Sequence, residues 1–206
     1  MSVTAYKAPG TAASVDRDSK TAWTDPDNIK VLDASDAENS LGKDDYGDWI
    51  RATNFGFTAT DIPVGATIDG IEVSIYRHCK SDGNAADSAL YMRDSTGQVG
   101  DNEASATAWP LAVTEAVYGG SEDMLGTTLD QADIVASTFG IDLSVQNSVG
   151  VHHTVQVDFI RVRVYYTAGA STSIKTVFGT PIAEIKTING VAIADVKSWL
   201  GISNVD

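Results

Sequence analysis

The chain has 206 residues, 43% of them hydrophobic, which is enough for one substantial globular domain with an appendage. It carries 28 Asp and Glu against 14 Lys and Arg, a formal net charge of −14. This balance disfavours nucleic acid and anionic membranes as partners, because both reward clustered positive charge. The single cysteine, Cys79, excludes an internal disulfide.

The beginning of the chain, MSVTAYKAPG, lacks the basic region and the apolar run of a secretory signal. No apolar run approaches the roughly 20 residues that a membrane helix needs. We therefore expect a protein that is made in a cytoplasm without a signal peptide and is not inserted in a membrane. Release from the cell would need another route.

Residues 1–48 are polar and weakly periodic, and we expect an extended N-terminal segment packed on the main domain. Asp25-Pro26-Asp27-Asn28 is typical of a turn, and Ile29–Leu32 is at most one brief strand. Trp23 is the only large anchor in this part.

Residues 49–167 carry the clear strand signals, in which apolar and polar residues alternate or β-branched and aromatic residues gather. The predicted strands are Trp49–Thr60, Thr67–His78, Ala89–Arg93, Phe139–Val145 and Thr154–Tyr166. One short helix is expected at Leu129–Ser137, with Thr128 as its N-cap. This pattern predicts a mostly β domain, an antiparallel β-sandwich or jelly roll.

The segment Thr154–Tyr166 is the most strand-like, and we expect it to be a central strand. Its alternation changes phase between Phe159 and Ile160. Either a strand covered on both faces or a β-bulge explains this change. Asp158 falls on the apolar face of the second half, so it is either a buried, paired carboxylate or a sign of the bulge.

Residues 168–173 have the composition of a linker, and residues 174–206 form a repeat-containing extension. Glycine recurs there every eleven residues, at Gly179, Gly190 and Gly201. We expect short helical turns separated by glycine, one from Pro181 and one over Ala192–Leu200.

The apolar side chains of this extension need a surface to cover them, because so few repeats cannot form a core alone. A neighbouring part of the chain, a sister subunit or a larger assembly would supply that surface. The predicted assembly contacts are Ile182, Ile185, Ile193, Val196 and Trp199.

The sequence holds no signature of a catalytic site, since GxSxG, HExxH and phosphate-loop motifs are all missing. The histidines are His78, His152 and His153, and adjacent residues on a strand point to opposite faces, which suits a metal site poorly. We therefore expect a protein that is not an enzyme, and we assign no catalytic residue.

Four aspartates crowd one predicted loop, and hard cations such as Ca²⁺ take several oxygens from such loops. They are Asp25, Asp27, Asp33 and Asp36. A calcium site is one interpretation of this loop, and a plain solvated acidic loop is the other. Their spacing does not match an EF-hand, and no other cofactor is expected.

Aromatic residues in or near loops and strand edges are candidates for stacking against sugar rings. Trp23, Trp109 and Tyr118 are the chosen candidates, and Trp49 and Trp199 lie in similar positions. The alternative is that these side chains close the open ends of the sandwich, because Trp is usually largely buried.

Several runs of the sequence stand out together. They are Phe55-Gly56-Phe57, Ile62-Pro63, Ala66–Val73, Trp109-Pro110, Tyr118-Gly119-Gly120, Phe139-Gly140, Val157-Asp158, Val162–Tyr166 and, in the extension, Ile188–Ser198. This set resembles virion proteins of tailed bacteriophages and prophages, whose structural and tail proteins often end in such a repeat. The first copy departs from the pattern, with Thr180-Pro181 where the second has Val191-Ala192.

The resemblance implies a jelly-roll-like module of the virion that decorates the head or forms part of a tail or fibre, and it carries over no catalytic residue. Other virion proteins and further copies of the chain would be its partners. We therefore expect a structural protein of a phage particle that assembles through its terminal segments. The alternative is a carbohydrate-binding or receptor-binding β-sandwich module, with or without the assistance of calcium, and with a host surface glycan as its partner.

Overall fold

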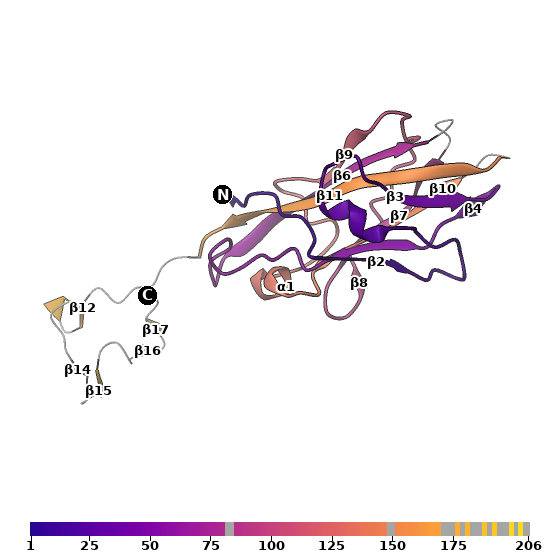
Figure 1. Cartoon of the computed structure of the whole chain (residues 1–206). Coiled ribbons are helices and arrows are strands. Elements are labelled where there is room, and N and C mark those ends of the chain that lie inside the picture. The colour runs from indigo at the N-terminus through magenta and orange to yellow at the C-terminus, as the bar shows by residue number, and fades with distance from the viewer. Residues whose placement is uncertain are drawn as a thin grey trace. The chain divides into compact units, whose positions relative to one another are not determined.

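The computed structural model describes residues 1–80, 85–147 and 151–169, together with the backbone of six two-residue strands further along the chain. Its contacts divide the chain into two units, Met1–Ala168 and Gly169–Asp206. The first unit is mostly β, as predicted, and its two antiparallel sheets face each other in a sandwich (Figure 1). In the described part of the chain, no helix has the length and hydropathy that a membrane crossing requires.

One sheet has five strands in the order β1-β11-β6-β9, and β3 pairs with the first half of β11. The long central strands β6 and β11 run antiparallel over nearly their whole length. The bounds are β1 (Ser2–Val3), β3 (Ala37–Leu41), β6 (Thr67–Cys79), β9 (Thr114–Gly119) and β11 (His153–Thr167).

The other sheet has six strands in the order β2-β5-β10-β7-β8, and β4 also pairs with β10. Strand β10 lies at its centre, between β7 on one side and β4 and β5 on the other. The bounds are β2 (Thr11–Val15), β4 (Asp45–Tyr46), β5 (Trp49–Thr53), β7 (Ala85–Arg93), β8 (Gln98–Val99) and β10 (Gly140–Asn147).

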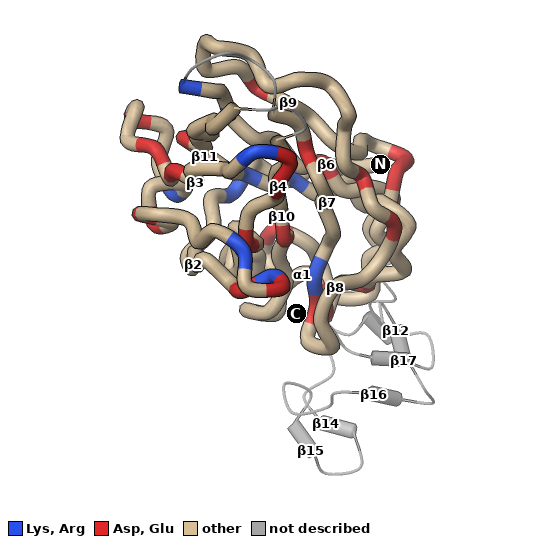
Figure 2. The backbone as a smooth tube through the Cα atoms, turned by 90° about the vertical axis from the view of Figure 1, so that its right-hand side faces the viewer, with Lys and Arg blue, Asp and Glu red and all other residues tan. Residues whose placement is uncertain are grey.

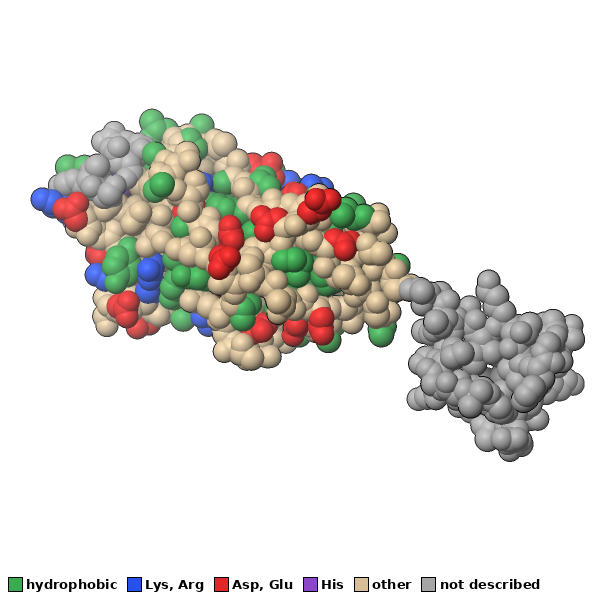
Figure 3. Space-filling view, turned by 180° about the vertical axis from the view of Figure 1, so that it is seen from behind, with side chains coloured by type: hydrophobic (Ala, Val, Ile, Leu, Met, Phe, Trp, Pro, Cys, Tyr) green, Lys and Arg blue, Asp and Glu red, His purple; other side chains and the backbone are tan. Residues whose placement is uncertain are grey.

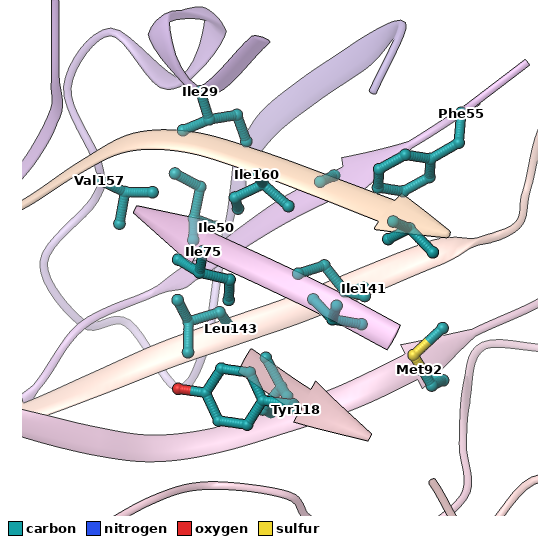
Figure 4. Packing of buried hydrophobic residues seen from close by; sticks show 14 of the residues in the cluster. Ile29, Ile50, Phe55, Ile75, Met92, Tyr118, Ile141, Leu143, Val157 and Ile160 are labelled. Carbon is teal, nitrogen blue, oxygen red and sulfur yellow. The ribbon is translucent and has the colours of Figure 1, made fainter. Parts of the chain in front are cut away.

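The core lies between the two sheets and is built from the inward positions of the central strands (Figure 4). Ile75 of β6 is opposite Ile160 of β11, and Ile141 of β10 is opposite Met92 of β7. These side chains are at most 1% exposed. Burying each of them stabilises the fold by roughly 1.5–3 kcal/mol. The two sheets pack together because the period-2 apolar pattern of their strands gives each sheet one apolar face.

The phase change predicted in β11 is a β-bulge. Val157 is opposite Arg77 and Phe159 is opposite Tyr76, so Asp158 is the extra residue. Asp158 is also buried and paired, because its Oδ1 accepts hydrogen bonds from the backbone N–H groups of Asp33 (3.3 Å) and Ala34 (3.1 Å). Both interpretations of this carboxylate therefore hold.

Residues 1–48 are part of the sandwich itself and do not form a separate extended segment packed on it. They supply the four strands β1 to β4 and the 3₁₀-helix η1 (Pro26–Lys30). The fully buried Ile29 of η1 packs into the core where a brief strand was expected. Short, irregular edge pieces of this kind have too few residues to show a periodic pattern.

Two other elements differ from their predicted bounds. Strand β5 ends at Thr53 because Asn54 and Gly56 have φ values of 58° and 68°, although Phe55 and Phe57 still reach the core. The helix α1 spans only Gln131–Val135, and its N-cap is Asp130, whose side chain accepts two backbone hydrogen bonds in a capping box.

The second unit contains three antiparallel strand pairs that repeat every eleven residues. They are β12 (Thr176–Val177) with β13 (Thr180–Pro181), β14 (Thr187–Ile188) with β15 (Val191–Ala192), and β16 (Ser198–Trp199) with β17 (Ile202–Ser203). The predicted helical turns are therefore wrong at Pro181, Ala192 and Ser198-Trp199. Within each pair, two residues separate the strands, and the second of them is glycine. The middle pair has Asn189-Gly190, a dipeptide typical of a two-residue β-hairpin turn.

Candidate functional site

The aromatic residues chosen for stacking are buried and offer no face to a sugar. Trp23, Trp109 and Tyr118 are 4%, 1% and 7% exposed. The indole N–H of Trp23 donates to the backbone oxygen of Asp48 over 2.9 Å. Their burial, which the alternative interpretation expected, is shown, because each ring is enclosed in the sandwich and its polar atom has a partner inside.

Trp109 and Tyr118 belong to a buried polar cluster around Asp87 of β7. This carboxylate accepts hydrogen bonds from Arg77 of β6, from Trp109 Nε1 (2.8 Å), from Tyr118 Oη (2.6 Å) and from the backbone N–H of Ser105 (2.8 Å). Burial, together with the charge of Asp87, raises the pKa of the Tyr118 phenol. The cluster links the two sheets, and its polar groups form their hydrogen bonds with one another.

A hollow of about 270 Å³ adjoins this cluster, between β9 and the preceding loop. Its lining includes Ala108, Pro110, Ala116 and Val117. Of its polar lining residues, Arg77 and Tyr118 bond to Asp87, Glu115 bonds to Ser74 and Arg161, and the Thr114 hydroxyl donates to the backbone oxygen of Ala112. Most of the polar groups that could orient a ligand in this hollow therefore already bond within the protein.

The four aspartates of the predicted calcium site are not brought together as one group of ligands in the described structure. Asp27 bonds to Lys30 (2.6 Å), Asp33 accepts from the backbone of Ser35, and Asp25 is exposed. Asp36 is partly buried beside His78, and burial raises its pKa. Within the described residues, no group of three or more His, Cys, Asp or Glu side chains is arranged to hold a metal ion.

The predicted assembly contacts cannot be placed. Ile182, Ile185, Ile193 and Val196 lie outside the described residues, and so does the side chain of Trp199.

The outer face of the six-stranded sheet carries partly exposed aromatic and charged side chains. Because Ile50, Leu90 and Ile141 point inward, their neighbours along the same strands point outward. We call this surface the arginine–aromatic face. It consists of Arg17, Tyr46, Trp49, Arg51, Tyr91, Arg93, Gln98 and Asp142.

Asp142 is the hub at one end of this face. Its carboxylate accepts two hydrogen bonds from Arg51 (2.8 and 3.0 Å), one from Arg93 (2.9 Å) and one from Gln98 (2.8 Å). Its side chain is 0% exposed because these long neighbours cover it. One carboxylate thus fixes two guanidinium groups across β5, β10 and β7.

Arg17 extends over the middle of the face from the chain after β2. Its guanidinium carbon lies 4.4 Å from the ring centroid of Tyr46 and 4.5 Å from that of Trp49. One of its NH₂ groups donates to Ser88 Oγ at 3.0 Å. Trp49 in turn meets Tyr91 edge to face, with ring centroids 6.1 Å apart. Cation–π contacts and this hydrogen bond therefore hold Arg17 in place.

A polar hollow of about 270 Å³ lies at the Tyr46 end of the face. Its lining is Asp44, Asp45, Tyr46, Gln146 and Asn147. Asp45 bonds to Lys20 at 3.0 Å, and this hydrogen bond lowers the pKa of Asp45. Carboxylate and carboxamide groups around one ring are the groups that bond sugar hydroxyls.

Basic and acidic segments lie close together around β4, β7 and β10 (Figure 2), whereas acidic side chains are spread over the surface seen in Figure 3.

The outer face of the five-stranded sheet differs from the arginine–aromatic face in the ion pairs of its arginines. Both of its arginines have a carboxylate partner, Arg161 with Glu115 and Arg163 with Glu72, each at 2.9 Å.

The sequence interpretation missed most of this face. Trp49 was one of its aromatic candidates, but Arg51, Tyr91, Arg93 and Asp142 went unnoticed. A signal was present, because these residues alternate with apolar ones along strands that are otherwise apolar. Arg17 has no such signal, since it reaches the face from a loop.

No protein-family model and no curated protein matches this chain. Among solved structures it is similar to the CBM22-1 xylan-binding domain of a Paenibacillus barcinonensis protein (13% identity, 79% of this chain and 87% of that one, TM-score 0.34). It is also similar to the family 30 carbohydrate-binding module of a Clostridium thermocellum cellulosomal cellulase (8% identity, 82% and 94%, TM-score 0.36).

A third similar structure is an exo-β-agarase, at 10% identity and a TM-score of 0.38 over 78% of this chain. The match covers 24% of the agarase, so it leaves most of that enzyme unmatched. At these scores the similarities assign neither a family nor an activity to the chain.

Proposed function

We propose that the sandwich is a carbohydrate-binding module and that a glycan lies along the arginine–aromatic face. The observation that carries the proposal is the row of partly exposed rings, Tyr46, Trp49 and Tyr91, on a rigid sheet beside guanidinium and carboxamide donors. Aromatic rings pack against the C–H surfaces of sugars, while fixed polar groups bond the hydroxyls.

The site requires little rearrangement to bind. The strands set the backbone positions of Trp49 and Tyr91, and Asp142 fixes the neighbouring arginines. Preorganised side chains lose less conformational freedom on binding, which favours affinity. The proposed module holds its ligand and performs no chemical step.

Binding of the full-length chain to an array of immobilised oligosaccharides tests this function. Trp49→Ala should weaken the binding of any captured glycan at least about tenfold, because truncating an aromatic anchor costs on the order of 2 kcal/mol. Tyr165→Ala, on the outer face of the other sheet, is the matched control and should bind as the unaltered chain does. Equal binding by all three proteins would place the site elsewhere, and the absence of any bound glycan would reject the function.

A second candidate function is that of a structural component of a tailed-phage particle. The observation that favours it is the eleven-residue spacing of the three strand pairs in the second unit. In this proposal the extension docks on other virion proteins or on further copies of the chain, and the sandwich contacts a host surface glycan. The sandwich without its extension would then fail to assemble.

A further inference from the structure

Arg17 differs from every other arginine of the chain in its partners. All six arginines are among the described residues, and Arg51, Arg77, Arg93, Arg161 and Arg163 each make an ion pair. Arg17 makes no ion pair with any carboxylate of the described residues, although the chain has 28 acidic residues. Its guanidinium has five N–H donors, and the described residues offer its side chain one acceptor, Ser88 Oγ.

The position of Arg17 keeps this group ready for an external partner. The rings of Tyr46 and Trp49 and the hydroxyl of Ser88 restrain the side chain, which remains partly exposed. A planar guanidinium held in this way matches the two oxygens of a carboxylate, sulfate or phosphate. The hollow for sugar hydroxyls begins at Tyr46, which Arg17 also contacts.

We infer that the glycan of the proposed module is acidic, and that Arg17 binds an oxyanion on one of its sugars. This inference rests on the proposed function and names the class of ligand for the same site. The neighbouring sugar would lie beside Tyr46, whose ring already carries Arg17 and Lys20, with its hydroxyls in the hollow lined by Asp44 and Gln146.

The carboxylates around Arg17 limit the ligand to isolated negative charges. Asp18 lies 3.4 Å from the hydroxyl of Tyr46, Asp45 lines the hollow, and Asp48 accepts from the backbone N–H of Arg17 at 2.9 Å. A nucleic acid carries a charge at every phosphate and would meet these carboxylates. An oligosaccharide with one acidic sugar among neutral ones would not.

The test uses the full-length chain and matched oligosaccharides. The probes are lactose, sialyllactose and sulfated lactose, then cellobiose and its uronic acid, with a single-stranded oligonucleotide beside them. At least one acidic member should bind about tenfold or more tightly than its neutral parent, and added salt should weaken that preference. The arm that shows the preference identifies carboxylate or sulfate as the source of the oxyanion.

Two variants of Arg17 then test its role. Arg17→Gln should bring the ratio of acidic to neutral affinity to about one, and Arg17→Lys should retain part of it because the charge stays while the planar fork is lost. Arg161→Gln, on the opposite face, should leave the ratio unchanged. Circular dichroism confirms that the variants are folded, and if Arg17→Gln unfolds, Arg17→Lys alone decides.

The outcomes separate the two proposals. Equal binding of acidic and neutral members would overturn the inference, and so would an affinity ratio that Arg17→Gln leaves unchanged. Both of these results would leave the proposed glycan binding intact. Tighter binding of the oligonucleotide than of any oligosaccharide would also overturn the inference. If no glycan of either kind binds, the proposed function itself falls.

Discussion

At Asp87, donors from β6, from β9 and from the loop between β8 and β9 converge on one carboxylate. Arg77 is 5% exposed and has Asp87 as its ion-pair partner, and its guanidinium also lies 4.8 Å from the ring centroid of Trp109. A buried guanidinium that loses its carboxylate keeps its charge, because arginine does not deprotonate in proteins. Asp87 therefore stabilises the fold mainly by compensating the buried positive charge of Arg77.

Asp87→Ala should lower the free energy of unfolding by about 3–5 kcal/mol, because it leaves the Arg77 charge buried and uncompensated. Urea denaturation of the full-length chain measures this change. Glu122→Ala removes an exposed carboxylate at an ordinary backbone position and should stay within about 0.5 kcal/mol of the unaltered chain. A loss below about 1 kcal/mol for Asp87→Ala would contradict the compensating role.

The sequence predicts the burial of some single residues of the site, but it does not predict their contact partners. The burial of Trp109 was foreseen as an alternative, since large aromatic rings favour the interior. Its partner could not be foreseen, because Asp87 lies 22 positions away and meets it only in the folded sandwich. The same holds for Arg17, whose neighbours come from β4 and β5.

Strands β6 and β11 form a ladder of cross-strand pairs, and one of these pairs is sensitive to pH. Glu72 is opposite Arg163, and it accepts hydrogen bonds from Arg163 and from the hydroxyls of Tyr6 and Tyr165. Burial raises the pKa of Glu72, but these three hydrogen bonds outweigh burial and bring its pKa below the ordinary value. The folded state therefore prefers the ionised carboxylate.

A depressed pKa in the folded state stabilises the protein above the unfolded pKa, and this contribution is lost as the pH falls. The free energy of unfolding should therefore decrease from about pH 5 towards pH 3, and Glu72→Gln should show a flatter decrease. Urea titrations of both proteins at a series of pH values measure the difference. Parallel curves would show that Glu72 does not contribute to the acid sensitivity.

The elements with long periodic patterns were predicted well, and the short ones were not. Thirteen residues of β6 and fifteen of β11 carry enough alternation to predict both type and position, and the change of phase at Asp158 was predicted with a β-bulge as one of its two explanations. Strands β1 and β4 have two residues each, and only their pairing with β11 and β10 makes them strands. Such elements are set by tertiary contacts that one sequence does not display.

On the scale of the whole molecule, the sandwich should not depend on the extension. A chain ending at Ala168 retains every residue of β1 to β11, so its urea midpoint should equal that of the full chain. A chain ending at Val164 loses the residues of β11 that pair with β1, and its midpoint should fall. Equal midpoints for all three chains would contradict this boundary.

Light scattering of the same two longer chains tests assembly. If the extension joins copies of the chain, only the full-length protein should be oligomeric, and the chain ending at Ala168 should be monomeric. Two oligomers of the same mass would place the self-association in the sandwich instead. Two monomers would rule out assembly of the chain with itself through the extension.

The pairing of β1 with the end of β11 brings Ser2 opposite Tyr166. The two ends of the sandwich are therefore neighbours in space, and a short peptide could join them. A circularly permuted chain, closed there and opened at the exposed residues 111–113 before β9, would keep every ladder of both sheets. The same geometry allows the sandwich to be inserted whole into a surface loop of another protein, entering and leaving at one point.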